Sequence, residues 1–153
     1  MPARIRNIAL FVIFLPCLVL GHVASSFAHE IRPAVATLTL GPEGRFELAV
    51  VVNIEAVIAG IGSEHRDTDE SPNAREYNHL RALPPEALRA EFEANAARYL
   101  DGIDLRFDGG RASLALAGIE IPPAGDVSLS RQSTVRFGGA VPAGAKALTF
   151  SYA

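Results

Sequence analysis

The chain has almost no cysteine. Its 153 residues contain one, Cys17, which lies in an N-terminal segment that we expect to be removed. The remaining chain would then have no disulfide, no cysteine nucleophile and no thiolate metal ligand. An exported domain without disulfides depends on its hydrophobic core for stability, which favours a bacterial periplasm over a small disulfide-rich secreted protein.

Positive charge is also scarce. The chain has 14 lysine and arginine residues against 17 acidic ones. Loss of Arg4 and Arg6 with the N-terminal segment leaves 12 against 17, a net charge of −5. Nucleic acids and anionic membrane surfaces both require a basic patch on the protein that binds them. We therefore expect neither as a partner.

The motifs of common hydrolases and nucleotide-binding enzymes are missing. The chain contains no G-x-S-x-G elbow, no H-E-x-x-H, no P-loop and no G-x-G-x-x-G. Carboxylates pair at Glu91 with Glu93 and at Asp67 with Asp69, but on segments that we expect to be exposed, which suits acid–base catalysis poorly. We therefore expect no enzymatic activity and identify no catalytic residue and no small-molecule substrate.

Residues 1–28 have the three-part order of a secretory signal peptide. Arg4 and Arg6 give a positive start, and an uncharged apolar run covers residues 8–20. The segment ends in Ser26-Phe27-Ala28, which has small residues at the two positions that signal peptidase reads.

The alternatives are an uncleaved anchor helix and a lipoprotein. A helix needs about 20 apolar residues to span a bilayer, whereas this run is shorter and contains Pro16. Cys17 lies inside the apolar run, and Pro16 stands where a lipoprotein signal needs a small residue. We therefore expect a bacterial chain that is periplasmic or secreted and begins at His29.

The first part of the mature chain has the pattern of strands. Residues 35–40 predict one strand, and 41–44 predict a turn. Apolar and other residues then alternate with a period of two over 46–54, which is typical of a strand with one apolar face.

The apolar period becomes that of a helix at Asn53 and returns to that of a strand after Gly102. We expect Asn53 to cap the first helix and Gly62 to end it. Ser71-Pro72 and Pro84-Pro85 predict the starts of two further helices.

Strands are expected again from residue 103. A hairpin turn at Asp108-Gly109 joins a strand at 103–107 to a returning strand at 112–116. The apolar phase slips by one residue at Gly118, which predicts a β-bulge. Two more strands are expected at 135–137 and 148–152.

These patterns predict a mainly β fold. We expect a β-sandwich-like domain over 29–153 with a helical insertion at about 54–102, preceded by the signal-peptide helix. The strand at 148–152 has an apolar face with no following sequence to cover it, and a bare apolar edge promotes aggregation. This favours the interpretation that residues 29–153 are the front part of a longer protein.

Four residues are candidate metal ligands. The free amine and imidazole of His29 would chelate Ni, Cu or Zn, and the loop with His65, Asp67 and Asp69 would add one nitrogen and two carboxylates. The loop does not fit a calcium hand, because Pro72 stands where that template requires glycine. The alternative is a solvated polar loop, with His29 marking only the cleavage site.

The opening of the mature chain, His29-Glu30-Ile31-Arg32-Pro33-Ala34, resembles the periplasmic front domain of HupE/UreJ-like bacterial membrane proteins. Shorter similar stretches are Asn53-Ile54-Glu55-Ala56, His65 to Pro72, Leu80-Arg81-Ala82-Leu83 and Ala147-Leu148-Thr149-Phe150. In that family the domain precedes several transmembrane helices, and the better-known relatives are linked to nickel uptake. No such helices follow in this sequence, so we do not expect it to carry out transport itself.

The resemblance implies an exported, non-enzymatic module that assists the handling of a nickel-type transition metal, with an integral membrane protein as its partner. One alternative is a structural or protein-binding β-sandwich without metal. Another is a copper mono-oxygenase-like enzyme that would use His29 and a second histidine.

The first prediction concerns processing. Because Ser26 and Ala28 are the small residues before the expected cleavage site, exported protein should begin at His29. N-terminal sequencing of the exported material measures this directly. A sequence that begins at Met1, or anywhere before Ser25, would contradict it.

Overall fold

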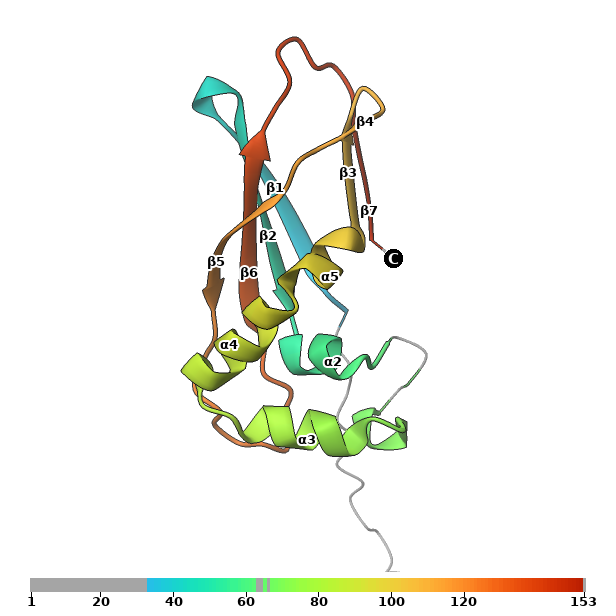
Figure 1. Ribbon diagram of the computed structural model, residues 1–153, viewed down its shortest axis with the longest axis vertical. Helices are drawn as coiled ribbons and strands as arrows, with labels where there is room; N and C mark the ends of the chain where they lie inside the picture. Colours follow the sequence, from blue (N-terminus) through green and yellow to red (C-terminus); the bar gives the residue numbers. More distant parts are fainter. Residues whose placement is uncertain (1–32, 63–64, 66, 153) are drawn as a thin grey trace, which may run out of the picture.

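The computed structural model describes residues 33–62, 65 and 67–152 (Figure 1). The predicted signal peptide, residues 1–28, and His29 lie outside the described residues. No helix in the described part of the chain is long and apolar enough to cross a membrane.

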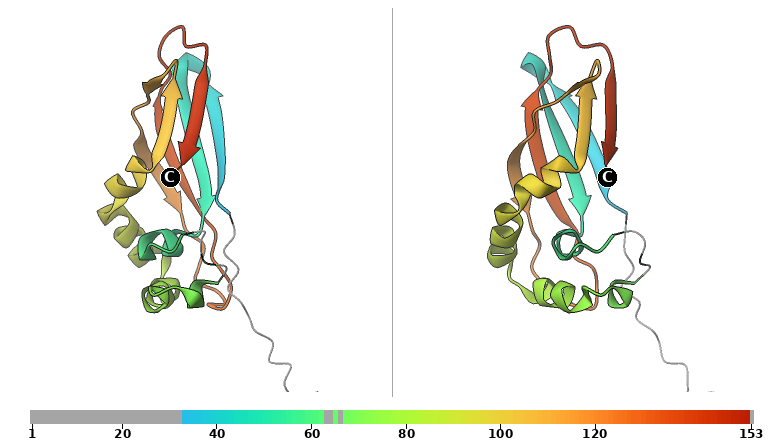
Figure 2. Two further views of the ribbon diagram at one scale, coloured as in Figure 1. Left: turned by 90° about the vertical axis from the view of Figure 1, so that its right-hand side faces the viewer. Right: turned by 45° about the vertical axis from the view of Figure 1, so that its right-hand side comes forward.

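The described strands form two antiparallel sheets. They are β1 (Val35–Gly41), β2 (Arg45–Val52), β3 (Ile103–Phe107), β4 (Gly110–Arg111), β5 (Ala115–Glu120), β6 (Ser133–Ala140) and β7 (Leu148–Tyr152). The first sheet has the order β1-β2-β6-β5 and the second the order β4-β3-β7. The chain thus crosses to the second sheet after β2, returns to the first after β4, and crosses to the second again after β6 (Figure 2).

The helices lie between β2 and β3 in the sequence and gather at one end of the sheets (Figure 1). They are α2 (Ile54–Ala59), α3 (Ala74–Ala82), α4 (Pro85–Ala94) and α5 (Ala96–Asp101), with short 3-10 turns at η1 (Pro42–Gly44) and η2 (Thr68–Glu70). About 36% of the described residues are in strands and 32% in helices. The fold is therefore mixed rather than mainly β, although its two antiparallel sheets agree with the β-rich prediction.

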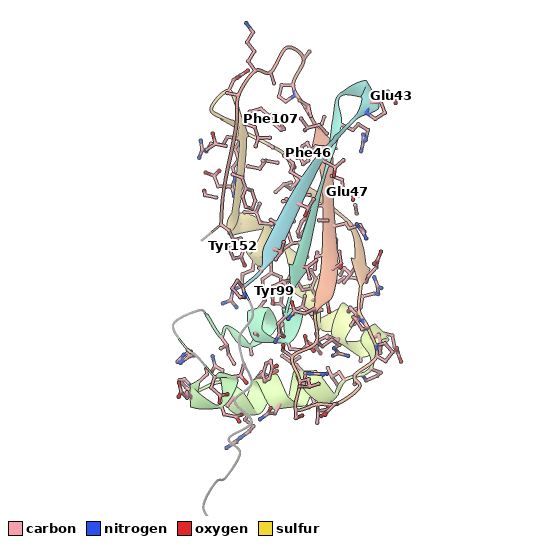
Figure 3. All side chains as sticks on the ribbon, turned by 180° about the vertical axis from the view of Figure 1, so that it is seen from behind. Glu43, Phe46, Glu47, Tyr99, Phe107 and Tyr152 are labelled. Carbon is pink, nitrogen blue, oxygen red and sulfur yellow. The ribbon has the colours of Figure 1, made fainter. Side chains whose placement is uncertain are left out.

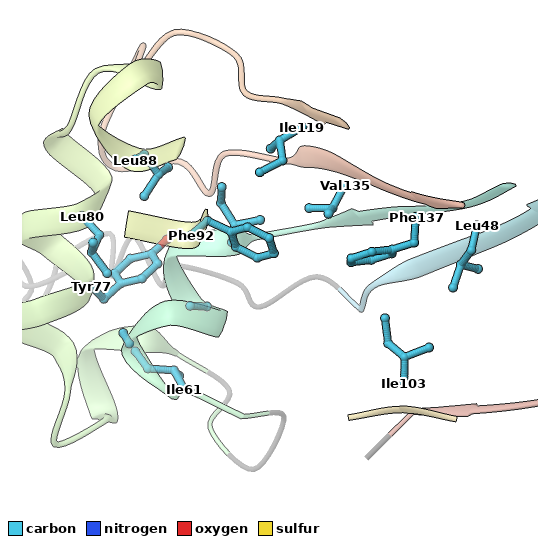
Figure 4. Close-up of a cluster of buried hydrophobic side chains, with 13 residues drawn as sticks. Leu48, Ile61, Tyr77, Leu80, Leu88, Phe92, Ile103, Ile119, Val135 and Phe137 are labelled. Carbon is cyan, nitrogen blue, oxygen red and sulfur yellow. The ribbon is translucent and has the colours of Figure 1, made fainter. Parts of the chain in front are cut away.

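The two sheets and the helices share an apolar core (Figure 4). Leu48 and Phe137 of the first sheet pack in one cluster with Ile103 of the second and with Phe92 of α4. A second cluster joins Phe46 to Phe107 across the sheets, with ring centroids 5.6 Å apart (Figure 3). The inner faces therefore exclude water along the middle of the molecule.

The start of α2 agrees with the sequence prediction, but its end does not. The Asn53 side chain accepts a hydrogen bond from the Ala56 N–H at 3.2 Å, as expected of an N-cap. The helix ends at Ala59 because Gly60, with φ 68°, takes up the left-handed conformation that closes it. The prediction that Gly62 ends the helix was therefore wrong, because the preceding glycine, Gly60, ends it.

The start of α3 is later than the sequence predicts. Ser71 and Pro72 form a turn in which the Ser71 hydroxyl accepts a hydrogen bond from the Asn73 N–H at 3.2 Å, and the helix begins at Ala74. The hydroxyl thus stabilises the turn before the helix rather than capping the helix itself. Pro85 is the first residue of α4, as predicted.

The hairpin after β3 is shorter than expected. Asp108 and Gly109 have the positive φ values of a two-residue turn, 47° and 83°. Strand β4 ends at Arg111, and after one further hydrogen bond, from the Ala112 N–H to the Leu105 carbonyl of β3 at 2.7 Å, the chain leaves for the first sheet. The predicted bulge is present, because the pairing of β5 with β6 shifts between Leu116 and Gly118.

Asp108 also fixes the start of β7. Its carboxylate accepts hydrogen bonds from the backbone N–H of Lys146 at 3.2 Å and of Ala147 at 2.8 Å. The turn of one hairpin therefore holds the residues from which β7 departs.

A buried ion pair joins the helices to the first sheet. The Arg131 Nε donates to the Glu55 Oε1 at 2.7 Å, and the two side chains are 2% and 0% exposed. The same guanidinium donates to the carbonyls of Leu83 and Pro122 at 3.2 and 3.3 Å. One side chain thus connects α2, the end of α3 and the segment before β6.

Arg81 makes a second set of buried contacts. Its guanidinium donates to the carbonyls of Leu129 at 2.6 and 2.7 Å, of Ala124 at 2.7 Å and of Asp126 at 2.8 Å. The segment between β5 and β6 contains no regular structure, so these bonds satisfy carbonyls that no strand or helix would satisfy.

The ion pair generates a stability prediction. Glu55→Ala leaves the Arg131 charge buried without its carboxylate, so we expect the free energy of unfolding to fall by about 3–5 kcal/mol. Urea denaturation followed by circular dichroism measures this loss. Glu93→Ala, which removes a half-exposed partner of Arg89 at 4.0 Å, is the control and should change the midpoint little. Equal effects from both variants would contradict the assigned role.

Candidate functional site

The predicted metal ligands do not form a group in the described structure. His65 is partly buried in the loop after α2, and the Asp67 carboxylate accepts a hydrogen bond from the Asp69 N–H at 3.0 Å. Among residues 33–62, 65 and 67–152, no three His, Cys, Asp or Glu side chains are placed to hold a metal ion. Because His29 lies outside these ranges, the four-residue site stays a prediction.

A different feature is a candidate binding site, an apolar cleft between the two sheets. Its volume is about 130 Å³, and residues of both sheets and of α2, α4 and α5 line it. All of the lining residues are apolar apart from Tyr99 and Tyr152. We call this space the open cleft.

The open cleft lies between β1 and β7. Each of these strands is the last strand of its sheet. On the β1 side it is lined by Ala34 and Ala36, whose small side chains leave space. On the β7 side it is lined by Phe150 and Tyr152, which remain 40% and 57% exposed. The inner faces of the sheets are therefore uncovered along this side.

The strands that border the open cleft lack the usual protection of sheet edges. Neither β1 nor β7 contains a charged residue or a proline. On the other side, β4 is only two residues long and carries Arg111, while β5 is bulged and carries Glu120. Charges, bulges and short strands are the devices that prevent edge pairing. They are present at the β4 and β5 edges and missing from β1 and β7.

The polar groups of the open cleft are phenols. Tyr99 stacks on Phe92 with ring centroids 4.8 Å apart, and Tyr99 and Tyr152, both labelled in Figure 3, line the cleft. Burial raises the pKa of Tyr99 above 10.0, Arg98 lowers it, and Tyr152 and Glu91 raise it. The hydroxyl is therefore protonated at neutral pH, and the lining residues include no carboxylate, imidazole or cation.

The sequence patterns did not identify the open cleft. Its one local signal is the pair of small residues, Ala34 and Ala36, on the inward face of a strand. The two alanines indicate a cleft only when β7 is known to lie opposite β1. Strand β7 is more than 100 residues away in the sequence.

Comparison of the chain with protein-family models, curated proteins and solved structures finds no match. The similarity to HupE/UreJ-like proteins therefore stays a prediction, as does the metal link that it implies.

The metal prediction has a direct test. If His29 and the loop of His65, Asp67 and Asp69 form a site, calorimetry on correctly processed protein should show binding of Ni(II), Cu(II) or Zn(II). His29→Ala should remove the chelating imidazole and His65→Ala a further nitrogen, so both should weaken binding. Unchanged isotherms for both variants would exclude the site. His79→Ala, at an exposed position on α3, is the control.

Proposed function

We propose that this chain is an exported, non-enzymatic, protein-binding module of the β-sandwich type, and that the open cleft is its binding site. The observation that carries this proposal is the difference between the two sides of the sheets. One side has edges that resist pairing, whereas the side with the cleft has uncharged edges and exposed apolar residues.

Energetics support a partner at the cleft. Phe150 and Tyr152 are about half exposed, and covering a large apolar side chain contributes about 1.5–3 kcal/mol when the burial is complete. The lining contains no ionised group that a partner would have to desolvate. An apolar surface of another protein would therefore gain stability from contact with these walls.

The nickel-handling function implied by the family resemblance remains a separate proposal. It depends on His29 and the loop at 65–69, whereas the open cleft uses none of these residues. An integral membrane protein is a suitable partner under either proposal.

Photo-crosslinking in the producing cells tests the proposed function. A photoreactive phenylalanine analogue at Phe150 should yield an adduct with one other protein, which mass spectrometry identifies. The adduct should disappear when Ala36→Phe fills the cleft from the β1 side.

The matched control places the same analogue at Thr37. This residue follows Ala36 on β1 and points to the opposite face of the sheet, so it should give no adduct. No adduct from position 150, equal adducts from positions 150 and 37, or an adduct only with a second copy of this chain would each contradict the proposal.

A further inference from the structure

We infer that the occupant of the open cleft is an extended, uncharged strand of the partner, which pairs antiparallel with β7 and inserts alternate apolar side chains between the sheets. This inference rests on the proposed function and specifies its partner. It follows from the backbone of β7, the make-up of the second sheet and the shape of the cleft.

The backbone of β7 presents its hydrogen-bonding groups to the open side. The Leu105 carbonyl accepts a hydrogen bond from the Ala112 N–H at 2.7 Å, so the polar groups of Leu105 point away from β7. Phe150 is opposite Leu105 in an antiparallel pair, and it therefore belongs to a non-hydrogen-bonded pair. Its own N–H and C=O must then point away from β3, toward the free edge.

Leu148 and Tyr152 share this orientation, because polar groups alternate along a strand. These three residues also have their side chains on one face, the face that includes the cleft-lining Phe150 and Tyr152. In the described part of the chain no strand pairs with this edge. The edge thus offers free donors and acceptors directly beside an apolar space.

The second sheet also needs a strand more than the first does. The first sheet has four strands, each six to eight residues long. In the second sheet β4 covers two residues, so β3 and β7 form a nearly isolated pair. A two-stranded pair is marginally stable alone, and a third strand on β7 would complete the sheet. For this reason we assign the docked strand to β7 rather than to β1.

The cleft sets the chemistry of the docked strand. A partner residue directly opposite Phe150 shares its face and therefore points into the cleft. The space beside Ala34 and Ala36 is about 130 Å³, close to an engineered cavity of about 150 Å³ that accepts benzene. A space of this size holds one or two branched aliphatic side chains, and a charge there would be buried without a partner.

A synthetic peptide tests the inference. The probe alternates valine and threonine over about seven residues, with acetylated and amidated ends. Calorimetry on the processed, exported chain should show binding. Two N-methylated versions then identify the pairing, because methylation removes the N–H of a residue without removing its side chain.

The two versions should differ. In antiparallel pairing, the residues with side chains in the cleft are those whose N–H groups face β7. Methylation of the valines should therefore weaken binding about tenfold or more, while methylation of the threonines should leave it nearly unchanged. Equal affinities, or the reverse order, would overturn strand pairing on β7.

Protein variants supply the second readout. Ala36→Phe should weaken peptide binding by filling the cleft, while Thr37→Phe on the opposite face should not. Circular dichroism of both variants checks that they fold. Absence of peptide binding, with the crosslink from position 150 retained, would overturn this inference and leave the proposed function standing. Peptide binding without a crosslinked partner would contradict the proposed function and leave strand pairing on β7 standing.

Discussion

The structure depends above all on one buried ion pair, between Glu55 and Arg131. Two charges removed from water lose their hydration, which their mutual attraction and further hydrogen bonds have to replace. Arg131 also donates to the carbonyls of Leu83 and Pro122, which belong to separate segments, whereas the Oε2 of Glu55 is buried without a hydrogen-bond partner among the described residues. The pair therefore fixes the helices against the end of the sheets. Because Val57 of α2, the helix that carries Glu55, lines the open cleft, the shape of the cleft depends on this ion pair.

The two sides of the molecule are built differently. Where β4 and β5 end their sheets, a short strand, a bulge and charges limit contact with other chains. Where β1 and β7 end theirs, regular uncharged strands border apolar walls. Each sheet has one protected edge strand, β5 or β4, and one unprotected edge strand, β1 or β7. The protection therefore differs between the two edges of the same sheet. Under the proposed function, binding takes place on the side of β1 and β7.

Local patterns in the sequence predicted local structure well. The change of period at Asn53 and after Gly102 marked the helical segment, and the phase slip at Gly118 marked the bulge. The end of α2 was placed wrongly because two nearby glycines, Gly60 and Gly62, can both end a helix. The ion pair and the open cleft could not be predicted, because each joins residues distant in sequence; Glu55 and Arg131 are 76 positions apart. Such contacts come from strand order, which no local period encodes.

The hold of Asp108 on Lys146 and Ala147 has a consequence for recognition. A strand bound only by its ladder can slide along its neighbour, and each shift of two residues restores the same pattern of faces. Here β7 starts from a fixed point, so Leu148, Phe150 and Tyr152 stand at set positions along the cleft. A segment docked on β7 therefore meets these three side chains in a fixed register. Partners would be distinguished by where their bulky residues occur along the sequence, and not only by how many they have.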